Sequence, residues 1–197
     1  MGIVFQYPEH QLFEETVFKD VCYGPKNLGL EKEEIESRAN EALRLVGIDE
    51  AIFSQSPFEL SGGQKRRVAI AGVISMKPKI LILDEPTAGL DPAGRKEILG
   101  LVSDLCRKQK MTIIRVSHSM DDVAEYADRI LVINDGKLAI DATPREVFNH
   151  KEELESFGLS LPQVTKAMVR IKESGIPVNT DAITVDEALN EILRVIK

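Results

Sequence analysis

Two adjacent carboxylates close an apolar run in the middle of the chain. Residues 79–83 read Lys-Ile-Leu-Ile-Leu, and Asp84 and Glu85 follow directly. Such a run is typical of a parallel strand buried on both faces, and open α/β sheets bind their ligands where these strands end. Neighbouring strand residues point to opposite faces, so one acid could hold Mg²⁺ through a water while the other orients a nucleophilic water. The alternative is a pair of surface acids at a strand end.

A second candidate site precedes this strand. The segment Ser61-Gly62-Gly63-Gln64 supplies a hydroxyl, two glycine amides and the start of a helix expected over 64–76. Free amides and the helix dipole favour an anion there, and glycine lets a phosphate oxygen approach the backbone. An ordinary helix N-cap is the alternative. The basic run Gln64-Lys65-Arg66-Arg67 is interpreted as a solvated helix face.

A histidine follows a third expected strand. Residues 111–117 read Met-Thr-Ile-Ile-Arg-Val-Ser, and His118 comes next. A lone histidine is more often structural than catalytic. Because the carboxyl ends of parallel strands share one sheet edge, His118 is expected near Asp84, and this position favours a functional role.

Strands and helices alternate along most of the chain, which predicts an α/β fold with a parallel sheet. Asn134-Asp135-Gly136 predicts a hairpin between two short strands, and Gly24-Pro25 is expected to end the first helix. The last third is helical and is interpreted as a small appendage. The expected strands are 2–5, 79–84, 111–117, 130–133 and 137–140, and the expected helices are 14–22, 31–46, 64–76, 92–109, 120–127, 144–157, 162–173 and 184–195.

Composition excludes several classes of protein. The 197 residues are 43% hydrophobic, which is enough for a packed core. The net charge is 25 − 32 = −7, which disfavours binding to nucleic acid through its phosphates. Two cysteines are too few for a disulfide scaffold. No apolar run approaches the length of a membrane span, and the first residues lack the features of a signal peptide.

Five sequence elements occur in an order that is recognisable. This order resembles the nucleotide-binding subunit of ATP-binding cassette (ABC) transporters over about residues 2–148. The elements look like that family's Q-loop, signature motif, Walker B strand with catalytic glutamate, D-loop and switch histidine. In the same order they are Gln6, Leu60-Ser61-Gly62-Gly63-Gln64, Asp84-Glu85, Ala88-Gly89-Leu90-Asp91 and His118.

Three longer tracts are most similar to the energy-coupling factor branch of that family. They are residues 5–13, 24–30 and 63–72. Complexes of that branch import vitamins and transition-metal ions such as cobalt or nickel. The resemblance implies a parallel sheet like that of P-loop NTPases with a helical subdomain at about 14–76, the ATPase domain spanning 1–142 and the helical appendage 143–197.

The resemblance also implies a role for each site residue. Asp84 would hold Mg²⁺, Glu85 would polarise the attacking water and His118 would contact the γ-phosphate of ATP. Gln6 would sense the metal and the water and link the site to a membrane partner. These roles suit phosphoryl transfer, which depends mainly on positioning and charge stabilisation.

The implied partners are proteins. Ser61, Gly62, Gly63 and Gln64 would close on ATP held by a second ABC ATPase subunit, identical or related, and Asp91 would organise that dimer. Residues 13–23 would face a membrane-spanning coupling subunit. The chain would then work peripherally, at the cytoplasmic face of the cell membrane.

One family motif is not found in these residues. The phosphate loop Gly-x-x-x-x-Gly-Lys-[Ser/Thr] does not occur, and Gly136-Lys137 is followed by Leu138. In the family this loop lies upstream of the Q-loop, so we expect a member without its amino-terminal Walker A portion that is inactive alone. Alternatives are the ATPase of another ABC importer class, a non-catalytic partner that contributes its signature motif in trans, and a soluble cassette ATPase of DNA repair or translation, which the acidic charge disfavours.

Overall fold

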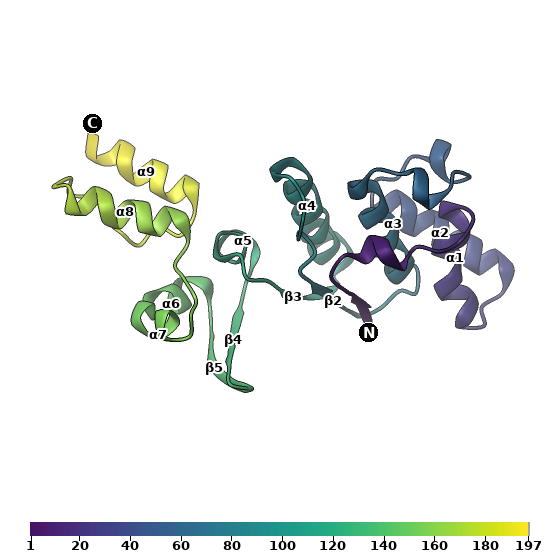
Figure 1. Ribbon diagram of the computed structural model, residues 1–197, viewed down its shortest axis with the longest axis horizontal. Coiled ribbons are helices and arrows are strands. Elements are labelled where there is room, and N and C mark those ends of the chain that lie inside the picture. The colour runs from purple at the N-terminus through teal and green to yellow at the C-terminus, as the bar shows by residue number, and fades with distance from the viewer. Residues whose placement is uncertain (197) are drawn as a thin grey trace. The chain divides into compact units, whose positions relative to one another are not determined.

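The computed structural model describes residues 1–196, which form two compact units (Figure 1). The first unit is Met1–Val116 and the second begins at Ser117. Among the described residues, no helix is both long and apolar enough to cross a membrane.

A three-stranded parallel sheet organises the first unit. Its strands are β1 (Gly2–Val4), β2 (Ile80–Asp84) and β3 (Thr112–Val116), in the order β1-β2-β3. Val4 lies opposite Leu83, and Asp84 lies opposite Val116, so the three strands end at one edge. The predicted parallel sheet is confirmed.

Helices cover one face of this sheet. Val4, Leu81 and Leu83 are buried in a core with residues of α3 (Gly62–Ile74) and α4 (Pro92–Gln109). The side chains of the opposite face include Ile3, Ile80, Ile114 and Val116, which are between 36% and 51% exposed. The expectation of a strand buried on both faces is therefore wrong for the first unit, because its helices pack against one side only.

A helical layer precedes β2. It contains α1 (Val17–Asn27), α2 (Lys32–Leu45) and α3, with short 3₁₀ turns η1 (Pro8–Gln11), η2 (Glu50–Ile52) and η3 (Pro57–Glu59). These helices lie where the sequence predicted a helical subdomain.

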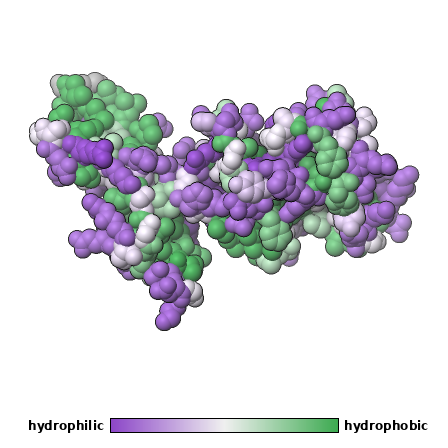
Figure 2. All heavy atoms as spheres, viewed as in Figure 1, coloured by the Kyte–Doolittle hydropathy of each residue, from purple (hydrophilic) through white to green (hydrophobic). Residues whose placement is uncertain are grey.

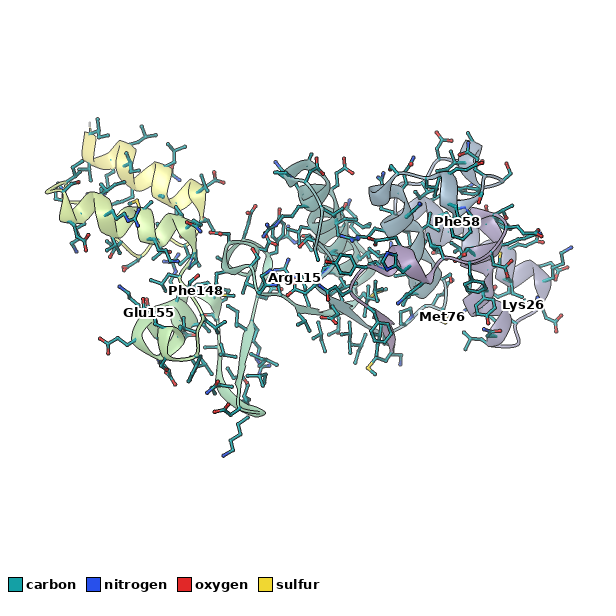
Figure 3. The ribbon with its side chains drawn as sticks, viewed as in Figure 1. Lys26, Phe58, Met76, Arg115, Phe148 and Glu155 are labelled. Atoms are coloured by element: carbon teal, nitrogen blue, oxygen red, sulfur yellow. The ribbon has the colours of Figure 1, made fainter. Side chains whose placement is uncertain are left out.

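The first helix does not end at Gly24-Pro25 as predicted. Pro25 has no N–H to donate to Val21 O, and the Ser75 hydroxyl donates to that carbonyl instead, at 3.1 Å. Gly24 allows α1 to approach α3 closely, since a Cβ there would lie 3.2 Å from Gly72 O of α3 and 2.9 Å from Cγ of Met76, which follows α3 and is labelled in Figure 3. The helix continues to Asn27 because a donor outside it bonds the buried Val21 carbonyl that Pro25 leaves unpaired.

The second unit has its own small core, which contains Val132, Ile140, Phe148 and Leu154 (Phe148 is labelled in Figure 3). Asp135 and Gly136 both have positive φ, 48° and 70°, and form the predicted hairpin turn. The elements of this unit are α5 (Met120–Tyr126), β4 (Ile130–Asn134), β5 (Lys137–Ala142), α6 (Pro144–Asn149), α7 (Lys151–Ser156), α8 (Gln163–Glu173) and α9 (Val185–Ile196).

One expectation for this part of the chain differs from the structure, and a second stays a prediction. The single helix predicted over 144–157 is two helices, because His150 leaves the helical conformation (φ −84°, ψ 49°). The predicted division between residues 142 and 143 falls inside the second unit, since β4 and β5 pair with each other and pack on α6 and α7. The extent of the family domain, residues 1–142, stays a prediction.

Candidate functional site

The two acids lie at the carboxyl edge of the sheet. Asp84 is the last residue of β2 and is half-buried, and no group in residues 1–196 donates a hydrogen bond to its carboxylate. Glu85 has left the strand: its φ is 45°, and its N–H donates to Val116 O at 3.1 Å. The direction of the Glu85 side chain is therefore set by a turn and not by strand alternation.

Gln6 comes to the same edge from the neighbouring strand. It is exposed and follows the end of β1 by two residues. The next residue, Tyr7, also has a left-handed backbone (φ 56°), and a Cβ on Gly89 would lie 3.6 Å from Tyr7 Cε1. The segment after β1 thus packs against the turn after β2, and the structure brings Gln6, Asp84 and Glu85 to one edge.

Arg66 joins these segments to α3. It is 1% exposed, and its guanidinium donates to both carboxylate oxygens of Glu9 and to the carbonyls of Pro86 and Ala88. The prediction that the basic run is a solvated helix face is wrong for this residue. The signal in the sequence was its spacing, because Arg66 precedes the fully buried Ile70 by four residues and so shares its helix face.

The Ser61–Gln64 segment begins α3 with a capping box. Ser61 Oγ accepts from the Gln64 N–H at 3.3 Å, and Gln64 Oε1 accepts from the Ser61 N–H at 2.9 Å. The Gly62 and Gly63 amides have no acceptor within residues 1–196. Beyond the adjoining residues and the backbone of α3 itself, no heavy atom of residues 1–196 lies within 4 Å of a Cβ added to either glycine, so no contact within this part of the chain requires glycine there. The open amides fit an anion approaching from outside the chain.

Asp91 is the N-cap of α4. Its Oδ1 accepts from the Gly94 N–H at 3.1 Å, and the residue is exposed. The structure therefore gives Asp91 a local structural role, and its predicted part in a dimer interface stays a prediction.

His118 belongs to the second unit. It is exposed and lies two residues after the end of β3. Ser119 begins α5 as its N-cap, accepting from the Asp122 N–H at 3.4 Å. The position of His118 relative to the acids stays a prediction.

The carboxylate of Asp84 suits a metal ion that is held jointly by the protein and a substrate. No group of three or more His, Cys, Asp or Glu side chains in the described part of the chain could enclose a metal ion. Mg²⁺ is usually bound through one or two carboxylates together with waters and substrate phosphates. Asp84, with no partner among the described residues and an open sheet face beside it, fits this mode of binding.

Comparisons with known proteins identify the family. The sequence model described as "ABC transporter" matches residues 1–88. The chain is 55% identical over 197 residues to the energy-coupling factor transporter ATP-binding protein EcfA2 of Caldanaerobacter subterraneus subsp. tengcongensis, covering all of this chain and 69% of that protein. The chain belongs to the ABC transporter ATPase family. Within this family, EcfA2 of Clostridium tetani is 56% identical over 196 residues, which are 99% of this chain and 68% of that protein.

Solved structures of this ABC family share the fold. The structure of cbiO1 from Clostridium perfringens, described as part of the ABC transporter complex cbiONQ, has a TM-score of 0.71 at 42% identity, covering 88% of this chain and 66% of that one. An ATP-binding cassette dimer solved in a post-hydrolysis state with ADP and phosphate has a TM-score of 0.60 at 29% identity, covering 73% of this chain and 62% of that one. The ABC ATPase chain described here thus spans about two thirds of the length of its relatives.

Proposed function

We propose that the chain forms the ATP-hydrolysing subunit of an energy-coupling factor importer for transition-metal ions or vitamins. The observation that carries the proposal is the match of the whole chain to proteins named as energy-coupling factor ATP-binding proteins. The five motifs, in order in this chain's own sequence, support it. The description of cbiO1 as part of a transporter complex supports the same assignment.

The proposed chemistry takes place at the carboxyl edge of the sheet. Asp84 would hold Mg²⁺, which neutralises charge on the ATP phosphates when bound. Glu85 would accept a hydrogen bond from the attacking water and orient it toward the γ-phosphate. His118 would donate to a γ-phosphate oxygen, and Gln6 would contact the water from the segment after β1. In this division of roles the protein mainly positions groups and stabilises charge.

Two protein partners follow from this function. A second ABC ATPase subunit, identical or related, would hold the ATP that receives the Gly62 and Gly63 amides, with Asp91 at the interface. A membrane-spanning coupling subunit would dock beside Phe13 and Tyr23, which are exposed and form an edge-to-face pair with ring centroids 4.8 Å apart. The chain would act peripherally at the cytoplasmic face of the membrane.

The decisive test is Glu85→Gln in the complex assembled with its ATPase partner and membrane subunit. We expect ATP binding to change by less than about twofold and ATP hydrolysis to fall by about 10²–10⁴-fold, because the glutamine cannot act as a base. Uptake of cobalt, nickel and vitamins, measured separately, would identify the class of cargo. Glu152→Gln, an exposed change on α7, serves as control. Unchanged hydrolysis in Glu85→Gln would contradict the proposal.

A further part of the proposal concerns the 197-residue polypeptide by itself. We expect it to bind ATP weakly and to hydrolyse it negligibly, because these residues contain no phosphate loop. This expectation would be contradicted if the purified polypeptide hydrolysed ATP robustly and Glu85→Gln abolished that hydrolysis.

A non-catalytic role in trans is the second candidate, and the intact capping box and open amides at Ser61–Gln64 favour it. Mixing with a full-length homologue separates the two. If Ser61→Arg in this chain removes the homologue's ATPase activity while Glu85→Gln does not, the chain only contributes its signature segment.

A further inference from the structure

We infer that Arg66 is a positioning residue that couples the segment after β1 to the turn that carries Glu85. The inference rests on the proposed function, since it assigns Arg66 the task of setting the catalytic geometry. It concerns a residue outside all five motifs and a contact between parts of the chain 57 and 20 residues apart.

The guanidinium is almost fully used by these two segments. Nη2 donates to Glu9 Oε1 at 2.9 Å and Oε2 at 3.1 Å, and Nε donates to Oε2 at 3.2 Å. Nη1 donates to Pro86 O at 3.0 Å and to Ala88 O at 2.9 Å. The planar fork of arginine suits this arrangement, because one side addresses a carboxylate and the other addresses two carbonyls. A lysine ammonium could not serve both sides with the same geometry.

Both segments held by Arg66 contain a residue in an unfavourable backbone conformation. Tyr7 (φ 56°) lies two residues before Glu9, and Glu85 (φ 45°) directly precedes Pro86. Residues in the left-handed region persist where surrounding contacts fix them, and they concentrate at functional sites. The Ala88 N–H donates to Glu85 O at 3.0 Å, so the turn that Arg66 holds is the turn that aims Glu85.

The pair is also shielded from solvent. The side chain of Arg66 is 2% exposed and that of Glu9 is 20% exposed. A charge-assisted pair in such surroundings is screened little by salt, and loss of one partner leaves a buried charge uncompensated. A movement of the Gln6–Glu9 segment is therefore passed to the Glu85 turn through one rigid side chain. The docking surface proposed for the membrane subunit begins at Phe13, four residues after Glu9, so Arg66 couples docking to the position of the catalytic carboxylate.

The test uses Arg66→Met in the assembled complex, which keeps the aliphatic stem and removes the fork. The kcat for ATP hydrolysis is divided by the number of ATP sites titrated in the same preparation, so that unfolded protein is not counted. We expect this kcat to fall about 10–100-fold with KM for ATP changed less than about threefold, because a displacement of about 1 Å at a catalytic group can cost about 10²-fold. Arg66→Lys is expected to restore little of it.

Arg44→Met is the matched control, because Arg44 also donates twice to a glutamate, Glu50, but both side chains are more than 60% exposed. Its kcat per site should equal that of the unchanged complex. Hydrogen exchange supplies a second readout: the amides of residues 7, 9–12 and 87–91 should exchange faster in Arg66→Met and not in Arg44→Met.

Glu9→Gln covers the case in which Arg66→Met does not fold. It removes the charge and leaves the bonds to the Pro86 and Ala88 carbonyls, and it should lower kcat per site without changing KM. The Glu9→Gln/Arg66→Met double variant should be no slower than Arg66→Met alone, because both act through one link. The inference is overturned if the kcat per site of Arg66→Met equals that of the unchanged complex. Where Arg66→Met does not fold, the same result for Glu9→Gln overturns it. Absence of ATP hydrolysis in the unchanged complex instead counts against the proposed function, and the exchange measurement then still decides the coupling.

Discussion

At the scale of single residues, the left-handed backbone conformations that no hairpin turn or helix end explains lie at the proposed catalytic edge of the sheet. Within residues 1–196, five non-glycine residues have positive φ. Lys77 and Lys110 follow α3 and α4, where a left-handed residue commonly ends a helix, and Asp135 lies in a hairpin turn. Tyr7 and Glu85 have no such role, and both lie at the carboxyl edge of the sheet. Their conformations are held by contacts from elsewhere, which makes this edge specific in geometry.

Cys22 gives a prediction at the same scale. Burial, with a smaller contribution from the Glu36 charge, raises the pKa of its thiol from 9.0 to about 11. The thiolate population near neutral pH is then about a hundredfold lower than that of an unperturbed thiol. We expect iodoacetamide to modify Cys22 about a hundredfold more slowly in the folded chain than in urea, measured by mass spectrometry in a Cys106→Ser background. Similar rates in both states would show that the thiol is neither buried nor perturbed.

The sequence predicted the chemical residues better than the residue that joins them. Asp84, Glu85 and Gln6 stand at strand ends, and the parallel register brings those ends together as expected. Arg66 was missed because burial of a charge depends on its partners. Glu9, Pro86 and Ala88 become its neighbours only through the tertiary fold, and no local pattern indicates them.

At the scale of elements, α1 depends on a donor from the residue that caps the end of α3. Ser75 is 1% exposed, and its single hydroxyl proton is shared between Gly72 O at 2.7 Å and Val21 O at 3.1 Å, the carbonyl that Pro25 leaves without its usual helical donor. We expect Ser75→Ala to lower the free energy of unfolding by about 1–3 kcal/mol, since a buried carbonyl loses its partner. In a Pro25→Ala background the same change should cost less, because the introduced alanine has an N–H that can donate to Val21 O. Urea denaturation of the four chains measures this, and equal costs in both backgrounds would rule the compensation out.

A glutamate fastens α9 to the loop before it. Glu191 accepts from both Arg194 Nε and Nη2 at 2.7 Å and from the Asn179 N–H at 2.6 Å. These bonds, first those from Arg194, lower the pKa of Glu191 from 4.5 to about 2. Because the folded value is the lower one, the stabilisation is complete above about pH 4.5 and is lost as the pH falls toward about 2. Carboxyl NMR titration should show this low pKa, and Arg194→Met should move it toward 4.5. Identical midpoints in the two chains would exclude the proposed cause.

Element boundaries were predictable where their signals are local. The helix expected over 92–109 has these bounds, because Asp91 caps it and Pro92 occupies its first turn. The end of α1 was predicted too early, since its compensating donor lies 54 residues away in the sequence. His150 interrupts a periodic pattern without glycine or proline, so nothing in the sequence marked the break.

At the scale of the whole molecule, two of the exposed apolar surfaces differ in what they offer to a second chain. One is the open sheet face, with Ile114 47% and Val116 51% exposed on the edge strand β3. The other is a stripe on α9, where Leu189 is 52% and Leu193 46% exposed, and hydrophobic side chains gather visibly over that helix in Figure 2. The two surfaces are similar in exposure and differ in geometry, because the sheet also presents an unpaired backbone edge.

This difference predicts how the 197-residue chain behaves alone. An edge strand with apolar side chains on an open face is a template for pairing with another chain, whereas the α9 stripe offers side chains only. We expect the chain to elute in size-exclusion chromatography above its monomer mass, and Ile114→Lys/Val116→Lys to shift it to the monomer. Leu189→Lys/Leu193→Lys, matched in exposure and charge, should leave the association in place. Two results would show that the open sheet face does not drive association: an unchanged chain that is already monomeric, or a chain that becomes monomeric only through the α9 changes. In either case, the role given to the backbone edge of the sheet would be wrong.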